Sequence, residues 1–322
     1  MQRRQLIQWS AAAALSGVAG HSLAQGGGVT RIIVGFAAGG STDILARHLA
    51  EQLKTTLGRP VIVENKAGAS GRLAVEAVKM AAPDGDTLLL APHGAMTLFP
   101  HVYKSLKYDP AKDFTPISRV SASDYAIAVN ATSPAQDLAG LKTWARSQGD
   151  RLAFGSPGTG TVLHFLGMQI GRGLDIKLSH IPYRGAAPAL ADLMGGSVQA
   201  VVTPLGDLIE MHKAGKIRVL ATAGSTRTPL IEGVPTLKDG GVQLDVSAWT
   251  ALYGPAGTSA STRDAIQKAV MQALQTPGMQ EKLRVIGMAA APNTAAALNA
   301  LQVSESALWA DAVKASGFTP ED

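Results

Sequence analysis

The chain of 322 residues contains no cysteine. An exported protein without cysteine has no disulfide framework and no thiol nucleophile, so hydrophobic cores alone must hold it together. No segment offers the ~20 uninterrupted apolar residues of a membrane span. Lysine and arginine form no cluster, and a net charge of only +5 gives no reason to expect nucleic-acid binding. The composition, 46% hydrophobic and 16% charged, is sufficient for sizeable cores.

The N-terminal residues have the features of a secretory signal peptide. A pair of arginines precedes a short apolar run, residues 11–18, and the triplet Ser22-Leu23-Ala24 is a small-x-small cleavage signal. We expect residues 1–24 to be removed, leaving a mature periplasmic protein that begins at Gln25. Paired arginines also occur in twin-arginine signals, so the export route stays open between that pathway and the general one.

Short β-branched apolar runs alternate with amphipathic helical patterns from residue 31 onward. The clearest helix covers residues 44–57, with leucine at every fourth position and Gly58 as its C-cap. This alternation predicts α/β lobes with largely parallel sheets, helices on both faces, and ligand sites at the carboxyl ends of the strands. The expected strands are residues 31–34, 61–64, 87–90, 151–154, 198–202 and 217–222.

The α/β pattern occurs twice, which agrees with the two domains that this length predicts. Two extended stretches, residues 120–130 and 244–254, stand where the pattern changes. We interpret them as two crossover strands that lie side by side and form the hinge of a clamshell. Two independent sequential domains remain the alternative. The expected lobes are residues 25–124 with 250–322, and residues 125–249.

A glycine-rich loop stands between the first expected strand and the strongest helical pattern. Its glycines let backbone N–H groups approach a ligand, while one of the polar residues at its end is expected to cap the helix. Because the positive end of the helix dipole lies at the same place, the loop predicts an anion site. A plain strand-to-helix turn is the alternative. The residues are Phe36, Ala37, Ala38, Gly39, Gly40, Ser41, Thr42 and Asp43.

A second glycine loop in the other lobe also leads into a helix. It nearly matches a phosphate-binding P-loop but lacks the lysine that should precede Thr161, so a nucleoside triphosphatase is disfavoured. The dinucleotide fingerprint fails because Leu163 stands in place of the third glycine. What remains is a second helix N-terminus that can face the first loop across a cleft. The candidate residues are Gly155, Ser156, Gly158, Thr159, Gly160 and Thr161.

Four further side chains are candidates for ligand contact. Arg184 can pair with a carboxylate in bidentate fashion, and Tyr183 can provide a wall with a hydroxyl group. A solvated surface cation is the alternative for Arg184. His93 and His164 stand near the ends of the loops, where a ligand hydrogen bond competes with a purely structural role.

Sequence signatures of catalysis and metal binding are otherwise absent. There is no Gly-x-Ser-x-Gly elbow and no His-Glu-x-x-His spacing, and we expect neither a metal nor a cofactor. An acid/base site stays open, because folding can pair aspartates that are distant in sequence. These aspartates are Asp43, Asp86, Asp192 and Asp207.

Several stretches, in order along the chain, resemble the Bug-type substrate-binding proteins of tripartite tricarboxylate transporters. The resemblance implies a type II periplasmic-binding-protein fold, no enzymatic activity, and a carboxylate held between the two glycine loops, partly through ordered waters. His93 and Ala37 depart from the residues common in that family, which leaves side-chain specificity open. The stretches are VGFAAGGSTDILARHLAEQL, GRPVIVENKAGASGRLAVEAVKMAAPDGDTLLLAPHG, FGSPGTGTVLHFLG, HIPYRGAAPALADLMGGSVQA and GKIRVLATAG.

The resemblance predicts a periplasmic solute-binding protein. We expect it to capture a small mono-, di- or tricarboxylate or an acidic amino acid and to deliver it, as a monomer, to membrane permease subunits. An exported α/β enzyme acting on a small carboxylate is the alternative. The sensor domain of a regulator is disfavoured by the signal peptide and the missing helix-turn-helix.

Overall fold

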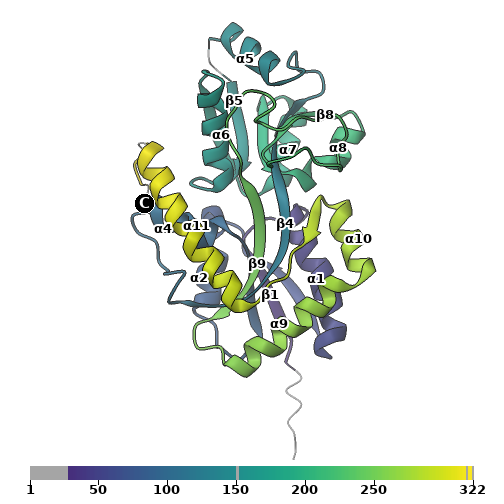
Figure 1. Cartoon of the computed structure of the whole chain (residues 1–322), viewed down its shortest axis with the longest axis vertical. Helices are drawn as coiled ribbons and strands as arrows, with labels where there is room; N and C mark the ends of the chain where they lie inside the picture. Colours follow the sequence, from purple (N-terminus) through teal and green to yellow (C-terminus); the bar gives the residue numbers. More distant parts are fainter. Residues whose placement is uncertain (1–27, 150–151, 317, 321–322) are drawn as a thin grey trace, which may run out of the picture.

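The computed structural model describes residues 28–149, 152–316 and 318–320, so the expected signal peptide lies outside the described residues. Two α/β lobes follow one another along the long axis and are connected by two long strands (Figure 1). Within the described residues, no helix is long and apolar enough to cross a membrane.

The first lobe is built on a sheet with the strand order β2-β1-β3-β9-β4. β1 runs parallel to β2 and β3, whereas β9 is antiparallel to its neighbours. Since alternate residues of a strand face opposite sides, Ile32 and Ile33 of β1 enter different hydrophobic clusters. The strands are β1 (Thr30–Val34), β2 (Val61–Asn65), β3 (Thr87–Pro92), β4 (Phe114–Asn130), β9 (Ser247–Pro255) and β10 (Met288–Ala290), which pairs with β4.

Helices cover both faces of this sheet. The leucines expected to repeat along the first helix are buried at Leu45, Leu49 and Leu53, and each such burial contributes about 1.5–3 kcal/mol. Gly58 closes the helix in the left-handed conformation, as expected. α1 (Ser41–Leu57), α9 (Ala260–Gln275) and α10 (Pro277–Val285) pack on one side, and α2 (Arg72–Lys79), α3 (Gly94–Thr97), α4 (Phe99–Val102) and α11 (Ala295–Ser316) on the other.

The second lobe repeats the design on the order β4-β7-β5-β6, with β8 also paired to β4. β5, β6 and β7 are parallel to one another. The strands are β5 (Leu152–Pro157), β6 (Leu178–Tyr183), β7 (Ala200–Pro204) and β8 (Ile217–Thr222). The helices are α5 (Leu138–Ser147), α6 (Val162–Gly173), α7 (Ala186–Gly195), η2 (Leu205–Asp207) and α8 (Ile209–Lys213).

The six expected strands are present, with shifts of a few residues at their ends. The sequence did not predict β6 or the three-residue β10. β6 lies at the edge of the sheet, is only partly buried and contains Pro182, so it lacks the continuous apolar run of a central strand.

The two crossover strands are β4 and β9, which lie side by side as expected and run antiparallel. Their pairing extends from Phe114 opposite Pro255 to Asp124 opposite Ser247. At the next residue, Tyr125, β4 takes β7 of the second lobe as its partner. One strand therefore belongs to both sheets, and two independent sequential domains are ruled out. The lobe boundaries set out above remain predictions.

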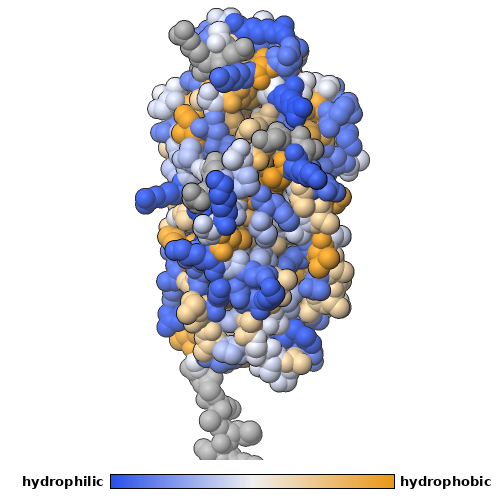
Figure 2. Space-filling view, turned by 90° about the vertical axis from the view of Figure 1, so that its left-hand side faces the viewer, coloured by the Kyte–Doolittle hydropathy of each residue, from blue (hydrophilic) through white to orange (hydrophobic). Residues whose placement is uncertain are grey.

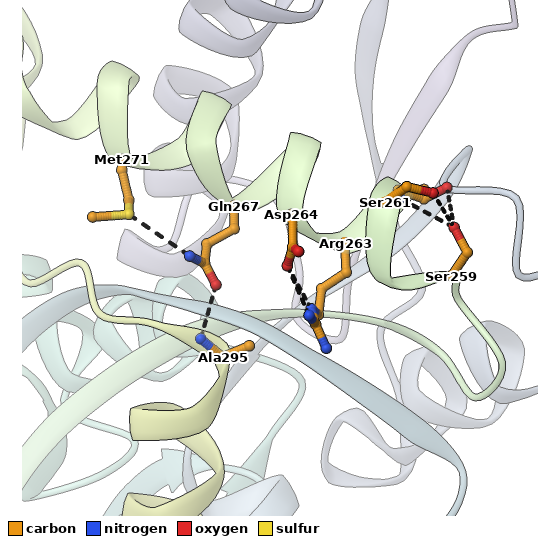
Figure 3. Close-up of polar contacts among 8 residues, drawn as sticks. Ser259, Ser261, Arg263, Asp264, Gln267, Met271 and Ala295 are labelled. Carbon is orange, nitrogen blue, oxygen red and sulfur yellow. Dashed lines mark hydrogen bonds and ion pairs between the residues drawn. The ribbon is translucent and has the colours of Figure 1, made fainter.

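The chain returns to the first lobe for its C-terminal helices. Gln267 on α9 accepts a hydrogen bond from the backbone N–H of Ala295, the first residue of α11, at 2.8 Å (Figure 3). α11 then runs along the side of the molecule towards the second lobe (Figure 1). Beyond its end, Phe318 packs edge-on against Phe165 of α6. On this side of the molecule apolar residues lie as separate spots among hydrophilic ones (Figure 2).

We predict that Gly167→Ala destabilises the second lobe. A Cβ at this position of α6 would lie 2.1 Å from the ring of Phe154, which is fully buried on β5 and cannot move aside cheaply. Overpacking of this kind costs about 1–3 kcal/mol. Gly195→Ala is the matched control, because a Cβ there meets nothing within 4 Å. Thermal unfolding should show a lower melting temperature for Gly167→Ala alone, and equal melting temperatures would contradict the packing argument.

Candidate ligand-binding site

A cavity of about 70 Å³ lies where the two lobes meet. At roughly 10–15 Å³ for one water molecule, it has room for about five waters or for a short organic molecule. Its wall contains apolar side chains such as Val75 and Phe99, and it contains loop and helix-start residues of both lobes. Of the residues expected at the site, Phe36, Ala37, Gly40, Ser41, Thr42, Asp43 and Thr161 line this cavity.

The first glycine loop places the N-terminus of α1 at the cavity. The helix begins at Ser41 and its N-cap is Gly40, which provides no side-chain cap. The expectation that Ser41, Thr42 or Asp43 caps the helix is therefore wrong, because all three already belong to its first turn. The backbone N–H groups of Thr42 and Asp43 donate to no other described residue. Two cavity-lining amides are thus left for a ligand.

The Asp43 side chain fixes the shape of this loop. It is buried and accepts hydrogen bonds from the Gly39 N–H at 3.0 Å and from Asn65 at 2.9 Å. Arg47, one turn further along α1, pairs with it at 2.9 Å. Burial by itself raises the pKa of Asp43, but the hydrogen bonds from Arg47, Gly39 and Asn65 outweigh it and hold the pKa below its ordinary value. Ala38 and Gly39 lie outside the cavity wall.

Asp207 reaches the same helix from the second lobe. Its Oδ1 atom accepts a hydrogen bond from the Ser41 N–H at 2.6 Å, and it lines the cavity from η2, just after β7. Burial raises the pKa of Asp207 to about 6, against the lowering effect of the hydrogen bonds from Ser41. Asp207 was one of the four aspartates that the sequence analysis named for a possible acid/base site. Its position after a strand was the only sequence feature that pointed to a role in the site.

The second glycine loop leads into α6, whose N-cap is Thr161. The Thr161 hydroxyl accepts from the His164 N–H at 3.3 Å and donates to the Gly158 carbonyl at 3.2 Å. Val162 and Leu163 follow in the cavity wall, and their backbone N–H groups donate to no other described residue. A second pair of helix-start amides therefore belongs to residues that line the cavity from the opposite lobe.

Other residues of the second loop lie away from the cavity wall. Ser156, one of the candidate ligand-binding residues, is buried within its lobe and is hydrogen-bonded to His180 at 2.8 Å. His164 stacks on the same ring, with centroids 3.9 Å apart, and its Nδ1 accepts from the Gly160 N–H at 3.1 Å. Burial lowers the pKa of His164 to about 4 and of His180 to about 3. The pair is therefore neutral at pH 7, and Gly155 packs behind it against Tyr183.

The loop residues from Gly158 to Gly160 hold the lobes together. The Thr159 carbonyl accepts hydrogen bonds from Ser70, at 2.7 Å, and from the hydroxyl of Tyr103. Both donors belong to the first lobe, Ser70 from η1 (Ala69–Gly71) and Tyr103 just after α4. Neither was predicted from the sequence, since a serine in a glycine-rich segment and an isolated tyrosine carry no distinctive pattern. We name these two hydrogen bonds the inter-lobe latch.

A third helix N-terminus joins the site at α7. Gly185 is its N-cap and Ala186 lines the cavity. Just before it, the Arg184 carbonyl accepts from the Ala37 N–H of the first lobe at 3.1 Å. The Arg184 side chain is exposed in an adjoining groove, and the Tyr183 hydroxyl donates to Asp192 at 2.7 Å. For Arg184 this placement agrees with the surface-cation alternative.

His93 lies at the hinge and outside the cavity wall. Its Nε2 contacts the Tyr125 hydroxyl of β4 and its Nδ1 contacts Glu305 of α11, both at 2.9 Å. Trp249 of β9 donates to the same carboxylate at 2.7 Å. Both hinge strands are therefore tied to α11 through one buried network. Of these residues, only Tyr125 also lines the cavity.

Four aspartates were considered above as members of an acid/base site. No hydrogen bond joins any two of their carboxyl groups in the described structure. Asp86 pairs with Arg59, and Asp192 accepts from Tyr183, while Asp43 and Asp207 both line the cavity. Among the residues the structure describes, no group of three or more histidine, aspartate or glutamate side chains is arranged to hold a metal ion.

Comparison with known proteins gives a consistent family assignment. A family model described as "Tripartite tricarboxylate transporter family receptor" matches residues 45–318. The periplasmic binding protein BugD is 30% identical, with a TM-score of 0.86 over 90% of this chain and 98% of its own. MatC from Rhodopseudomonas palustris, solved with bound malate, is 30% identical, with a TM-score of 0.83 over 88% and 98%.

A further R. palustris structure, solved with adipate, is 28% identical and has a TM-score of 0.87 over 90% of this chain and 98% of its own. These similarities confirm the type II periplasmic-binding-protein fold expected from the sequence. The chain belongs to the tripartite tricarboxylate transporter receptor family, among its Bug-type members.

Proposed function

We propose that this protein captures a small carboxylate between its two lobes. The observation that carries the proposal is a set of backbone N–H groups at the starts of α1 and α6. Their residues line one cavity from opposite lobes, and these amides have no hydrogen-bond partner among the described residues. Helix N-termini attract anions, and these interactions strengthen when water is excluded. The malate and adipate held by two relatives support a ligand of this class.

We infer that the protein binds its ligand without converting it. It works in the periplasm as a monomer and passes the ligand to the membrane permease subunits of a tripartite tricarboxylate transporter. The family assignment supports this role, as do the features of a signal peptide in residues 1–24. The residues that contact the ligand are those of the two glycine loops that line the cavity.

Titration calorimetry of the mature protein, residues 25–322, against a panel of small carboxylates tests this function. We expect saturable binding at one site for at least one member, and unchanged ligand by NMR after prolonged incubation. Consumption of the bound compound would favour the exported enzyme instead. A panel in which no carboxylate binds would contradict the proposal.

Gly158→Val should abolish ligand binding while leaving both lobes folded. Gly158 has a φ of +92°, and a Cβ there would lie 2.8 Å from the Ser70 hydroxyl of the opposite lobe, so a branched side chain obstructs closure. Gly196→Val is the control, because Gly196 has a φ of +79° but an added Cβ meets nothing within 4 Å. The control carries backbone strain without the clash and should bind normally. Undiminished binding by Gly158→Val would place the ligand elsewhere.

Loss of the inter-lobe latch should weaken binding by destabilising the closed form. Ser70→Ala and Tyr103→Phe each remove one neutral hydrogen bond to the Thr159 carbonyl. At about 0.5–1.5 kcal/mol for each bond, each dissociation constant should rise roughly 2- to 12-fold. Thr143→Ala, which removes an exposed hydroxyl on α5, serves as the control. Affinities equal to that of the control in both latch variants would show that these bonds do not favour closure.

A further inference from the structure

The Asp207 side chain caps α1 across the boundary between the lobes. The helix receives no side-chain cap from its own N-cap residue, Gly40, while Asp207 accepts the hydrogen bond of its first amide, Ser41, at 2.6 Å. A carboxylate is the group that a helix N-terminus prefers. The protein therefore fills part of its own anion site with a side chain, and only the Thr42 and Asp43 amides of this helix remain.

The charges around the cavity are unbalanced. No lysine, arginine or histidine occurs among the described residues that line it, and its two acidic residues are Asp43 and Asp207. The charge of Asp43 is compensated by Arg47 at 2.9 Å. Asp207 makes no ion pair with any described residue, and its hydrogen-bond donor is a neutral backbone amide. Of the two acidic residues in the cavity wall, Asp207 is thus the one without a cationic partner among the described residues.

A ligand carboxylate can avoid this charge by occupying the α6 side of the cavity, where Val162 and Leu163 present their amides. A second carboxylate on the same ligand cannot. It would share the cavity with the Asp207 side chain, and like charges brought together in a site with little water cost several kcal/mol.

We propose that Asp207 is a specificity-determining residue that restricts the site to monocarboxylates whose far end is neutral or donates a hydrogen bond. The inference rests on the proposed function and narrows it. Relatives were solved with the dicarboxylates malate and adipate. In this protein, Asp207 already accepts the hydrogen bond of the Ser41 amide at the start of α1, so that amide is not left for a ligand carboxylate.

Matched ligands test the inference. Succinate and succinamate have the same shape, but one of the two carboxylates of succinate is replaced by a carboxamide in succinamate. Malonate and malonamate form a shorter pair with the same difference. Calorimetry at pH 8, well above the pKa of about 6 of Asp207, keeps that side chain ionised. We expect the wild-type protein to bind the amide of a pair roughly tenfold or more tightly than the diacid.

Asp207→Asn should remove this preference. Its side-chain oxygen can still accept from Ser41, so the cap is retained while the charge is lost, and we expect the ratio of diacid to amide affinity to rise at least roughly tenfold. Asp207→Ser repeats the charge removal with a shorter side chain in case the first variant misfolds. Glu210→Gln is the control, because Glu210 is an exposed acid on α8 outside the cavity.

The outcomes separate the two claims. A diacid-to-amide ratio that is the same in the wild-type protein, the Asp207 variants and the Glu210 control would overturn the role of Asp207 and leave carboxylate capture standing. A wild-type preference for the diacid would overturn it as well. If neither member of any pair, nor any simple monocarboxylate, binds to any of these folded proteins, the proposed function itself fails and the inference fails with it.

Discussion

The antiparallel pairing of β4 with β9 is the constraint on which the rest of this structure depends. It brings residues far apart in sequence into register, from Phe114 opposite Pro255 to Asp124 opposite Ser247, and it lets one strand serve two sheets. One hydrophobic cluster extends through both lobes, and each lobe has a further cluster of its own, while few covalent connections join the lobes. In this chain without cysteine, hydrophobic packing and the two shared strands join the lobes, an arrangement that permits hinge bending.

The site follows from this arrangement, because the carboxyl ends of parallel strands in both lobes lead into helices at the same boundary. α1 starts after β1, α6 after β5 and α7 after β6, and their N-termini line one small cavity. Among the described residues that line it, none is a lysine, an arginine or a histidine, so partial charges of the backbone are what this site offers to an anion. In the function proposed above, many oriented dipoles hold the ligand, and separation of the lobes with the return of water releases it.

The regular part of the structure was predictable from the sequence because it depends on local patterns. Apolar runs located the strands, leucine spacing located α1, and glycine marked both loops. Contacts between residues distant in sequence were not predictable: Ser41 with Asp207, and Ser70 and Tyr103 with the Thr159 carbonyl. His93 was a reasonable candidate by position, but only the fold shows it joined to Glu305 and Tyr125 at the hinge.

The use of backbone amides has a consequence for how this site can evolve. Every residue except proline carries the same N–H group, so point substitutions at Thr42, Val162 or Leu163 can change the lining without deleting the donor. Substitution of these side chains then changes which molecule fits the cavity, while the backbone amides that bind its carboxylate are retained. Proteins that share this backbone framework can in this way evolve to bind different nutrients through only a few substitutions among the residues that line the cavity.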